Sequence, residues 1–282
     1  MIKANYHTHT SFCDGSAEPE IFVQEAIKRG FKALGFSGHA PLPYKTSWTM
    51  NLPVLSSYCE TIAILREKYR DKIQIYLGLE VDYIPGIMGP SIDQYKQCGL
   101  DYIIGSVHHI QDHTNEYIPT IDGTYEEFLR IITNLFKGNM KALVQHYYKL
   151  VREMLTQYFP DILGHFDLVK CRNDGEYAFS EEEPWYRAEI LKTLDVMVSG
   201  KTIMEINTGG YARKKVDAFY PSEWILAECL KRNIPVTISS DAHTPEHIDA
   251  LFQESVDTLR RIGFKELSLL LNNTWTKVEL VT

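Results

Sequence analysis

Short apolar segments alternate with longer amphipathic segments along the whole chain. The short segments predict seven strands, near residues 4–7, 33–37, 73–80, 102–107, 162–165, 203–207 and 236–240. The longer segments predict helices near residues 19–29, 55–69, 91–98, 125–159, 184–198, 222–232 and 245–261, with the 125–159 segment broken near Gly138 and Asn139. Strands that alternate with helices are typical of a parallel sheet covered by helices.

The chain contains no linker rich in Gly, Ser or Pro and no internal repeat, so we expect a single domain over residues 1–282. Seven strand–helix units fit either a barrel or an open doubly wound sheet. A dinucleotide-binding sheet would carry G-x-G-x-x-G after the first strand, but the chain reads His-Thr-His-Thr-Ser there. A P-loop, the glycine-rich segment that binds nucleotide phosphates, is also absent. The common nucleotide-binding motifs are therefore excluded.

Composition and charge limit the kinds of partner that the chain is expected to bind. The 282 residues are 44% hydrophobic and 23% charged, with a net charge of −8 and no dense Lys/Arg block, so we expect no nucleic-acid partner. The five cysteines form no C-x-x-C pair, and no apolar run approaches the roughly 18 residues of a membrane span. We therefore expect a cytoplasmic protein without membrane contact, and we make no prediction of its oligomeric state.

Metal-binding or hydrogen-bonding side chains follow each of the seven predicted strands. In strand order they are His7, His9 and Asp14; His39; Glu80; His108; His165; Asn207; and Asp241 with His243. The carboxyl ends of the strands in a parallel barrel lie on one face, where active sites form. Two residues spaced by two on extended chain point to the same side. We therefore expect these side chains to form one cluster.

A lone histidine at a strand end is usually a structural residue, but seven of the ten histidines lie at or beside the predicted strand ends. Clusters of histidine with carboxylates indicate metal sites. Imidazole and carboxylate without thiolate suit Zn, Mn, Fe or Co. The candidates outnumber the ligands of one ion, so we expect two or three ions, with Glu80 as the natural bridging group.

The residues resemble the motif set of the polymerase-and-histidinol-phosphatase (PHP) domain family. The matching segments are His7-Thr8-His9 with Asp14, Ser-Gly-His at His39, Gly-Ser-Val-His at His108, Gly-His-Phe-Asp at His165 and Ser-Asp-Ala-His at Asp241 and His243, together with Glu80. The resemblance covers essentially the whole chain and fills all nine ligand positions of the family. It is strongest to the histidinol-phosphate phosphatase branch.

This resemblance implies a distorted (β/α)₇ barrel, similar to a TIM barrel, with three divalent ions (Zn, Mn or Fe). The first ion would be held by His7, His9, Glu80 and Asp241. Glu80 would bridge to a second ion, held also by His108 and His165. The third would be held by Asp14, His39 and His243. The implied activity is the hydrolysis of L-histidinol phosphate to L-histidinol and phosphate in histidine biosynthesis.

Phosphate monoesters hydrolyse extremely slowly without a catalyst. Two neighbouring ions can generate a hydroxide nucleophile and stabilise the displaced oxygens. We expect such a hydroxide, beside Glu80, to attack phosphorus in line, while Asp241, His243 or a metal-bound water protonates the leaving alkoxide. Glu80, Asp241 and His243 are therefore the predicted catalytic residues.

The small phosphorylated substrate needs contacts on the loops after the fifth and sixth strands. On these loops we expect them from Arg213, Arg172, Lys170, Asn207 and Tyr211. His109, which follows the fourth strand beside His108, is a further candidate, and it would otherwise face the core or support a metal ligand. Gly209 and Gly210 would permit a close approach before Arg213, and Tyr211 would stack on an imidazole. Asp82 and Asp167 lie two residues beyond ligand candidates, where they would orient metal ligands. His113, His146 and His247 are expected to lie away from the site.

Two other functions fit the same motifs. The chain would act on a different phosphomonoester or, like the PHP modules of polymerases, on a phosphodiester of a nucleotide or nucleic acid. The acidic charge favours a small monoester over the second. A non-catalytic, metal-stabilised domain is the remaining alternative, but such a domain is expected to have lost ligands, and none is missing.

Overall fold

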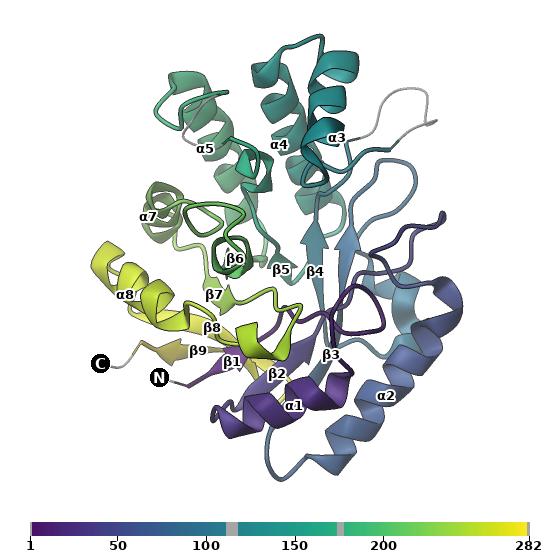
Figure 1. The fold of residues 1–282 in the computed structure, drawn as a ribbon. Helices are drawn as coiled ribbons and strands as arrows, with labels where there is room; N and C mark the ends of the chain where they lie inside the picture. The colour runs from purple at the N-terminus through teal and green to yellow at the C-terminus, as the bar shows by residue number, and fades with distance from the viewer. Residues whose placement is uncertain (1, 111–117, 174–177, 281–282) are drawn as a thin grey trace.

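All seven predicted strands form, and they pair in chain order (Figure 1). The computed structural model describes residues 2–110, 118–173 and 178–280. The strands are β1 (Ala4–Asn5), β2 (Ala33–Phe36), β3 (Gln74–Asp82), β4 (Tyr102–Ser106), β5 (Ile162–Leu163), β6 (Ile203–Asn207) and β7 (Val236–Ser239). Each strand is parallel to the next. The parallel sheet predicted from alternation is confirmed.

The first and last strands meet just beyond their carboxyl ends, which brings the sheet round into a barrel. Thr8 and Ala242 form a parallel bridge. Around it the His9 amide donates to the Ala242 carbonyl (2.9 Å), and the Ala242 amide donates to the His7 carbonyl (3.1 Å). β1 and β5 have only two residues each, so the barrel is irregular. This is the distorted (β/α)₇ barrel that the family resemblance implies.

Helices surround the sheet (Figure 1). They are α1 (Pro19–Lys28), α2 (Leu55–Lys68), α3 (Tyr125–Arg130), α4 (Met140–Gln157), α5 (Pro184–Val198), α6 (Gly209–Ala212), α7 (Glu223–Lys231) and α8 (Phe252–Ile262). The break near Gly138 is confirmed, because this glycine has a φ of 80° between a π-helical turn at Ile131–Leu135 and α4. The segment predicted as one helix at 245–261 is instead a 3₁₀ turn and α8, divided at Leu251 with a φ of 59°.

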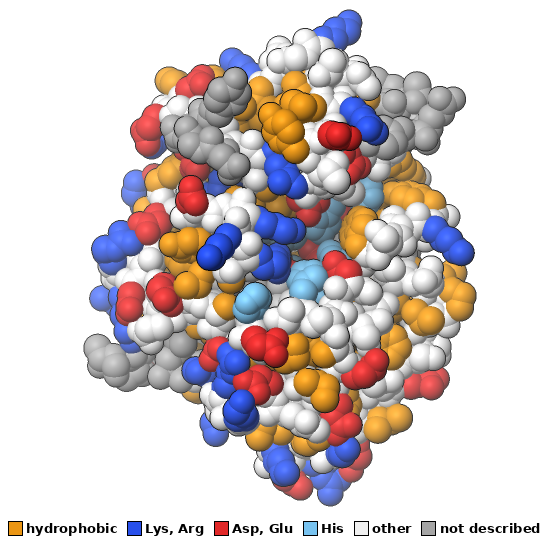
Figure 2. Space-filling model, in the orientation of Figure 1, with side chains coloured by type: hydrophobic (Ala, Val, Ile, Leu, Met, Phe, Trp, Pro, Cys, Tyr) orange, Lys and Arg blue, Asp and Glu red, His pale blue; other side chains and the backbone are white. Residues whose placement is uncertain are grey.

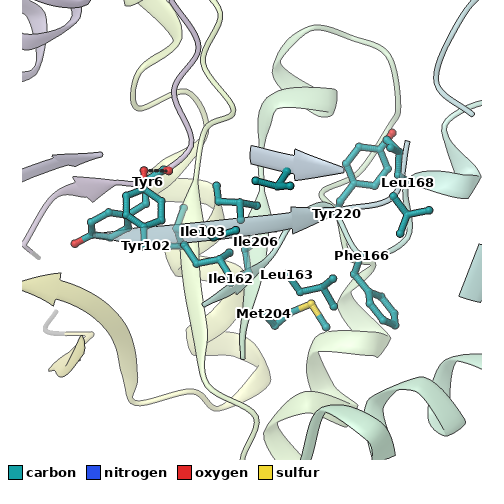
Figure 3. Packing of buried hydrophobic residues seen from close by; sticks show 14 of the residues in the cluster. Tyr6, Tyr102, Ile103, Ile162, Leu163, Phe166, Leu168, Met204, Ile206 and Tyr220 are labelled. Atoms are coloured by element: carbon teal, nitrogen blue, oxygen red, sulfur yellow. Dashed lines mark hydrogen bonds between the residues drawn. The ribbon is translucent and has the colours of Figure 1, made fainter. Parts of the chain in front are cut away.

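Tyr102 fills the barrel between β2 and β3. Its hydroxyl donates to the Tyr6 carbonyl (2.6 Å), and the two rings meet edge to face with centroids 5.9 Å apart (Figure 3). A Cβ atom on Gly35 or Gly78 would overlap the Tyr102 side chain. The two glycines are therefore required by close packing, and this part of the barrel is a solid core.

The sequence analysis missed a hairpin formed by β8 (Glu266–Leu271) and β9 (Thr274–Glu279). The turn residues Asn272 and Asn273 have φ values of 50° and 60°, as a type I′ turn requires. The Asn272 amide donates to the side chain of Gln74, the first residue of β3. The hairpin therefore lies at the amino ends of the strands, opposite the predicted site.

None of the helices in the described ranges is long and apolar enough to cross a bilayer.

Candidate metal centre

The nine predicted ligands meet at the carboxyl ends of the strands. His7 and His9 follow β1, His39 follows β2, His108 follows β4 and His165 follows β5, while Glu80 lies within β3 and Asp241 and His243 follow β7. Asp14 comes from the turn after His9. Seven of these side chains belong to buried residues, whereas Asp14 is exposed and His243 is half-buried. The spatial cluster expected from the strand ends is therefore present.

Glu80 lies at the middle of the cluster. Its Oε2 atom lies 2.9 Å from His39 Nδ1, and its Oε1 atom lies 2.8 Å from His165 Nε2. Five imidazoles have a nitrogen within 3.6 Å of the carboxylate, those of His7, His9, His39, His108 and His165. One carboxylate thus faces ligands from four other strand ends.

A second carboxylate, that of Asp14, lies among three imidazoles at the outer part of the cluster. His243 Nε2 lies 3.2 Å from Asp14 Oδ2, and His9 Nδ1 lies 3.6 Å from Asp14 Oδ1. His39 Nε2 is 3.9 Å from the same oxygen. The rings of His9 and His243 stack at a centroid distance of 4.2 Å.

Three groups of side chains in the described part of the chain have donor atoms close enough to share an ion. They are His9, Asp14, His39 and His243; His7, His9 and Asp241; and His39, Glu80 and His108. His9 and His39 each belong to two groups, whereas the family resemblance assigns each to one ion. His165 lies in none of the three groups, although it contacts Glu80.

The hydrogen bonding of the cluster fits metal binding. His7 Nε2, His9 Nε2, His39 Nδ1 and Glu80 Oε2 are buried, and none has a hydrogen-bond partner of acceptable geometry in the described residues. Buried polar groups without partners are rare in native proteins because each costs desolvation free energy. These atoms point at one another and are the donor types of zinc, manganese and iron. The residues present therefore fit divalent ions.

Electrostatics favour ionised carboxylates in the cluster. Burial alone would raise the pKa of Glu80, but His39, His7 and His108 together hold it well below its usual range. Burial opposes ionisation of Asp241 in the same way, and Arg213 and His7 reverse the effect on its pKa. For His9, burial and the neighbouring His243 and His39 lower the pKa to about 3, so this imidazole is neutral and able to donate a lone pair to a cation.

Two buried carboxylates contact imidazoles of the cluster from outside it. Asp82 Oδ1 lies 2.9 Å from His108 Nδ1, as expected for a residue that orients a ligand. Glu205 Oε1 lies 2.6 Å from His7 Nδ1, and its other oxygen accepts a hydrogen bond from the His165 amide (2.9 Å). In each case the outer carboxylate binds Nδ1 and leaves Nε2 facing the cluster.

The sequence analysis missed Glu205. A signal was available, because Glu205 and Asn207 are spaced by two on β6 and therefore lie on one face. It also missed Trp48, Thr120 and Asp122, which line the cavity from loops outside the strand ends. Their sequence neighbourhoods carry no periodic pattern that would place them there.

A cavity of about 220 Å³ opens above the cluster, and Figure 2 shows histidine and acidic side chains in this hollow with Lys and Arg gathered along one rim. Arg172, Arg213 and Lys215 are the Lys and Arg residues that line it in the described part of the chain. Arg213 Nη2 lies 2.9 Å from Asp241 Oδ2. A Cβ atom on Gly209 would lie 2.9 Å from Arg213 Nη1, so this glycine allows the expected close approach.

The other predicted substrate contacts are placed differently. Arg172 lines the cavity and donates to the Gly123 carbonyl. Lys170 is buried in an ion pair with Asp167 (2.7 Å), and Asn207 Nδ2 donates to Glu205 Oε2 (3.0 Å). Neither of these two lines the cavity.

Tyr211 and His109 also lie outside the cavity lining. The Tyr211 ring contacts Phe219, and no imidazole of the described residues stacks on it. The His109 ring stacks on Trp48 at 5.6 Å, and its Nδ1 atom lies 3.3 Å from Asp82 Oδ1.

One orienting role was predicted wrongly. Asp167 binds Lys170 and the Ser222 amide (3.0 Å) instead of a metal-ligand candidate. The reason is that β5 ends at Leu163 and the chain turns into a 3₁₀ helix at Leu168–Lys170, so the alternation of an extended strand does not reach Asp167. His146 contacts Phe136 and His247 lies in a 3₁₀ turn, both away from the cavity, and His113 lies outside the described residues.

Two curated relatives match this chain over most of its length. The histidinol-phosphatase of Bacillus subtilis is 29% identical over 262 residues, covering 86% of this chain and 94% of that protein. The histidinol-phosphatase of Lactococcus lactis is 28% identical over 276 residues, covering 95% and 94%.

Solved structures share the fold. A protein from Listeria monocytogenes superposes with a TM-score of 0.78 at 23% identity, covering 89% of this chain and 99% of that one. The histidinol phosphate phosphatase of Lactococcus lactis, complexed with zinc, L-histidinol and phosphate, superposes with a TM-score of 0.72 at 23% identity, covering 98% and 99%.

The family model described as the PHP domain matches residues 5–209. Asp241 and His243 lie beyond the matched segment, and the barrel brings them against His7, His9 and Asp14. The chain belongs to the PHP domain family.

Proposed function

We propose that this chain is a metal-dependent phosphomonoesterase that hydrolyses L-histidinol phosphate to L-histidinol and phosphate in histidine biosynthesis. The observation that carries the proposal is the Glu80 carboxylate surrounded by imidazoles at the floor of a small cavity with guanidinium groups in its wall. The relatives named histidinol-phosphatase, which match this chain over most of their length, support the choice of substrate.

We propose that the nine strand-end residues hold three divalent ions, of zinc, manganese or iron. His7, His9, Glu80 and Asp241 would hold one, Glu80, His108 and His165 a second, and Asp14, His39 and His243 a third. When bound, such ions activate water for attack and neutralise the charge that develops on phosphorus. Zinc in the Lactococcus lactis structure is consistent with this donor set.

The chain's own side chains position the reaction. Arg213 lies in the cavity wall, where Nη1 donates to the Asp241 carbonyl and Nη2 to its carboxylate. The guanidinium has five N–H groups, so it can also donate to a phosphoryl oxygen in the cavity. Asp241 and His243 also line the cavity, so each is placed to carry the proton that the leaving alkoxide needs. Glu205 and Asp82 fix the ring orientation of His7 and His108.

The reaction is expected to take place in the cytoplasm. All five cysteines, Cys13, Cys59, Cys98, Cys171 and Cys229, are free thiols. Free thiols are typical of proteins in reducing compartments.

A substrate panel tests the proposed function. Protein reconstituted separately with zinc, manganese and iron would be assayed with L-histidinol phosphate, other small phosphomonoesters and single-stranded DNA. We expect the highest kcat/KM for L-histidinol phosphate. Faster turnover of another monoester or of DNA would reassign the substrate, and no turnover of any ester by metal-loaded protein would indicate a binding domain.

Replacing Arg213 with Met is expected to lower kcat/KM for the phosphomonoester and to weaken competitive inhibition by inorganic phosphate, each by about tenfold or more, because hydrogen bonds to charged groups contribute about 1.5–3 kcal/mol. Steady-state kinetics with phosphate as inhibitor measures both. Lys214→Met is the control, since Lys214 is exposed and does not line the cavity. Unchanged phosphate inhibition in Arg213→Met would remove Arg213 from the substrate site.

A further inference from the structure

Asp122 is an acidic residue in the cavity wall that is not one of the nine predicted metal ligands. Among the described residues, the acidic side chains that line the cavity are Asp14, Glu80, Asp122 and Asp241, and the other three belong to the proposed ligand set. Asp122 is half-buried. In the described part of the chain its carboxylate forms no ion pair, and the cations Lys170 and Arg213 pair with Asp167 and Asp241 instead. The nearby Arg172 donates to the main-chain carbonyls of Asp122 (3.3 Å) and Gly123. The negative charge of Asp122 therefore remains available to a ligand.

The backbone on either side of Asp122 is held in place. The Ile121 amide donates to the carbonyl of His108 at 2.7 Å, which ties this loop to the end of β4. The Cys171 thiol donates to the Ile121 carbonyl (3.4 Å), and Arg172 holds the Gly123 carbonyl. A carboxylate on so constrained a segment loses little conformational entropy when it binds a ligand.

The cavity wall carries opposite charges on different segments. Arg213 and Lys215 follow α6, whereas Asp122 precedes α3. Asp122 lines the same cavity as the predicted ligands Glu80 and His108. A ligand that occupies the cavity can therefore place an anionic group at the cluster and Arg213 and a cationic group at Asp122.

We propose that Asp122 is a specificity-determining residue that binds the protonated amine of an amino-bearing phosphomonoester while the phosphoryl group lies at the metal ligands. This inference rests on the proposed function, because L-histidinol phosphate carries such an amine on the carbon next to the ester-bearing carbon. It adds that the amine, and not the imidazole ring alone, selects the substrate.

Two pairs of substrates that differ only in the amine test this role. The first pair is L-histidinol phosphate and its amine-free analogue 3-(imidazol-4-yl)propyl phosphate. The second is phosphoethanolamine and ethyl phosphate. For each pair, the ratio of kcat/KM with and without the amine would be measured in the wild type, in Asp122→Asn and in the control Glu126→Gln. Glu126 is an exposed acidic residue four positions away that does not line the cavity.

We expect the wild type to prefer the amine-bearing member of each pair, and Asp122→Asn to reduce that preference by at least about tenfold, as for loss of a hydrogen bond to a charged group. In Asp122→Asn, kcat/KM for the amine-free esters should change by less than about threefold. Glu126→Gln should change the amine preference in neither pair. No amine preference in the wild type, or an equal loss on both members of a pair in Asp122→Asn, overturns the inference. If the second pair shows the effect while L-histidinol phosphate is not hydrolysed, the role of Asp122 stands and the proposed substrate fails.

Discussion

Glu80→Gln is expected to abolish most of the phosphatase activity and to lower the metal content of the purified protein. The carboxylate faces five imidazoles from four other strand ends, and one of its buried oxygens has no hydrogen-bond partner in the described residues. An amide has nearly the same shape, but it carries no charge and offers only one oxygen to an ion. The loss of activity should exceed the roughly 10–100-fold effect typical of removing an outer partner of a metal ligand.

Elemental analysis and steady-state kinetics on the same sample measure this prediction. Asp101→Asn is the matched control, because this carboxylate accepts from the Leu77 amide (2.7 Å) and pairs with Arg66 just before β4 begins, at the opposite end of the barrel. The control should lose about 1–3 kcal/mol of unfolding free energy, as expected for a charged hydrogen bond, and keep its metal content and kcat. Full metal content and full kcat in Glu80→Gln would contradict the role of Glu80.

Glu205→Gln is expected to weaken metal binding by about 10–100-fold, since outer partners of metal-binding histidines have effects of that size. The Glu205 carboxylate accepts from His7 Nδ1, the His165 amide and the Asn207 side chain, so it joins residues from three strands. Glutamine can replace only one of these acceptor oxygens, and its NH₂ group would face a donor. We expect the His7 ring to be held less firmly and its Nε2 atom to become less basic.

Competition with a chromophoric chelator measures the metal affinity of this variant without relying on activity. Glu189→Gln is the control, because Glu189 pairs with Arg152 at 2.9 Å between α4 and α5 and lies outside the cavity lining. Excess zinc should restore part of the activity of Glu205→Gln, because added metal fills a weakened site by mass action. An unchanged chelator competition curve would show that Glu205 only supports packing.

The residues at the strand ends of this barrel could be predicted from sequence for two reasons. Apolar runs mark buried parallel strands, and a parallel barrel brings their carboxyl ends together. His7, His39 and His165 come from distant parts of the chain, yet each lies within three residues of the end of its strand, so their convergence was predictable. Asp241 was also predictable in sequence, although its φ of 47° shows that the chain there no longer follows strand geometry.

The surroundings of the site were less predictable, because loops set them. Asp167 was misplaced since β5 ends at Leu163 and His165 already has a φ of 22°, and Lys170 forms a buried ion pair with Asp167. Trp48 and Asp122 reach the cavity through loops whose course depends on tertiary contacts. The C-terminal hairpin was missed because its turn, Asn272-Asn273, lacks the Asn-Gly pair that most strongly indicates such turns.

The release of phosphate from L-histidinol phosphate should be measured on one protein preparation before metal removal, after it and after reconstitution. The nine strand-end residues are the proposed ion-binding machinery, and three groups of them lie close enough to share ions. We predict that chelator-stripped, folded protein releases no phosphate above background and that added zinc, manganese or iron restores turnover in proportion to bound metal. Full turnover by the stripped protein would contradict a metal-dependent phosphomonoesterase.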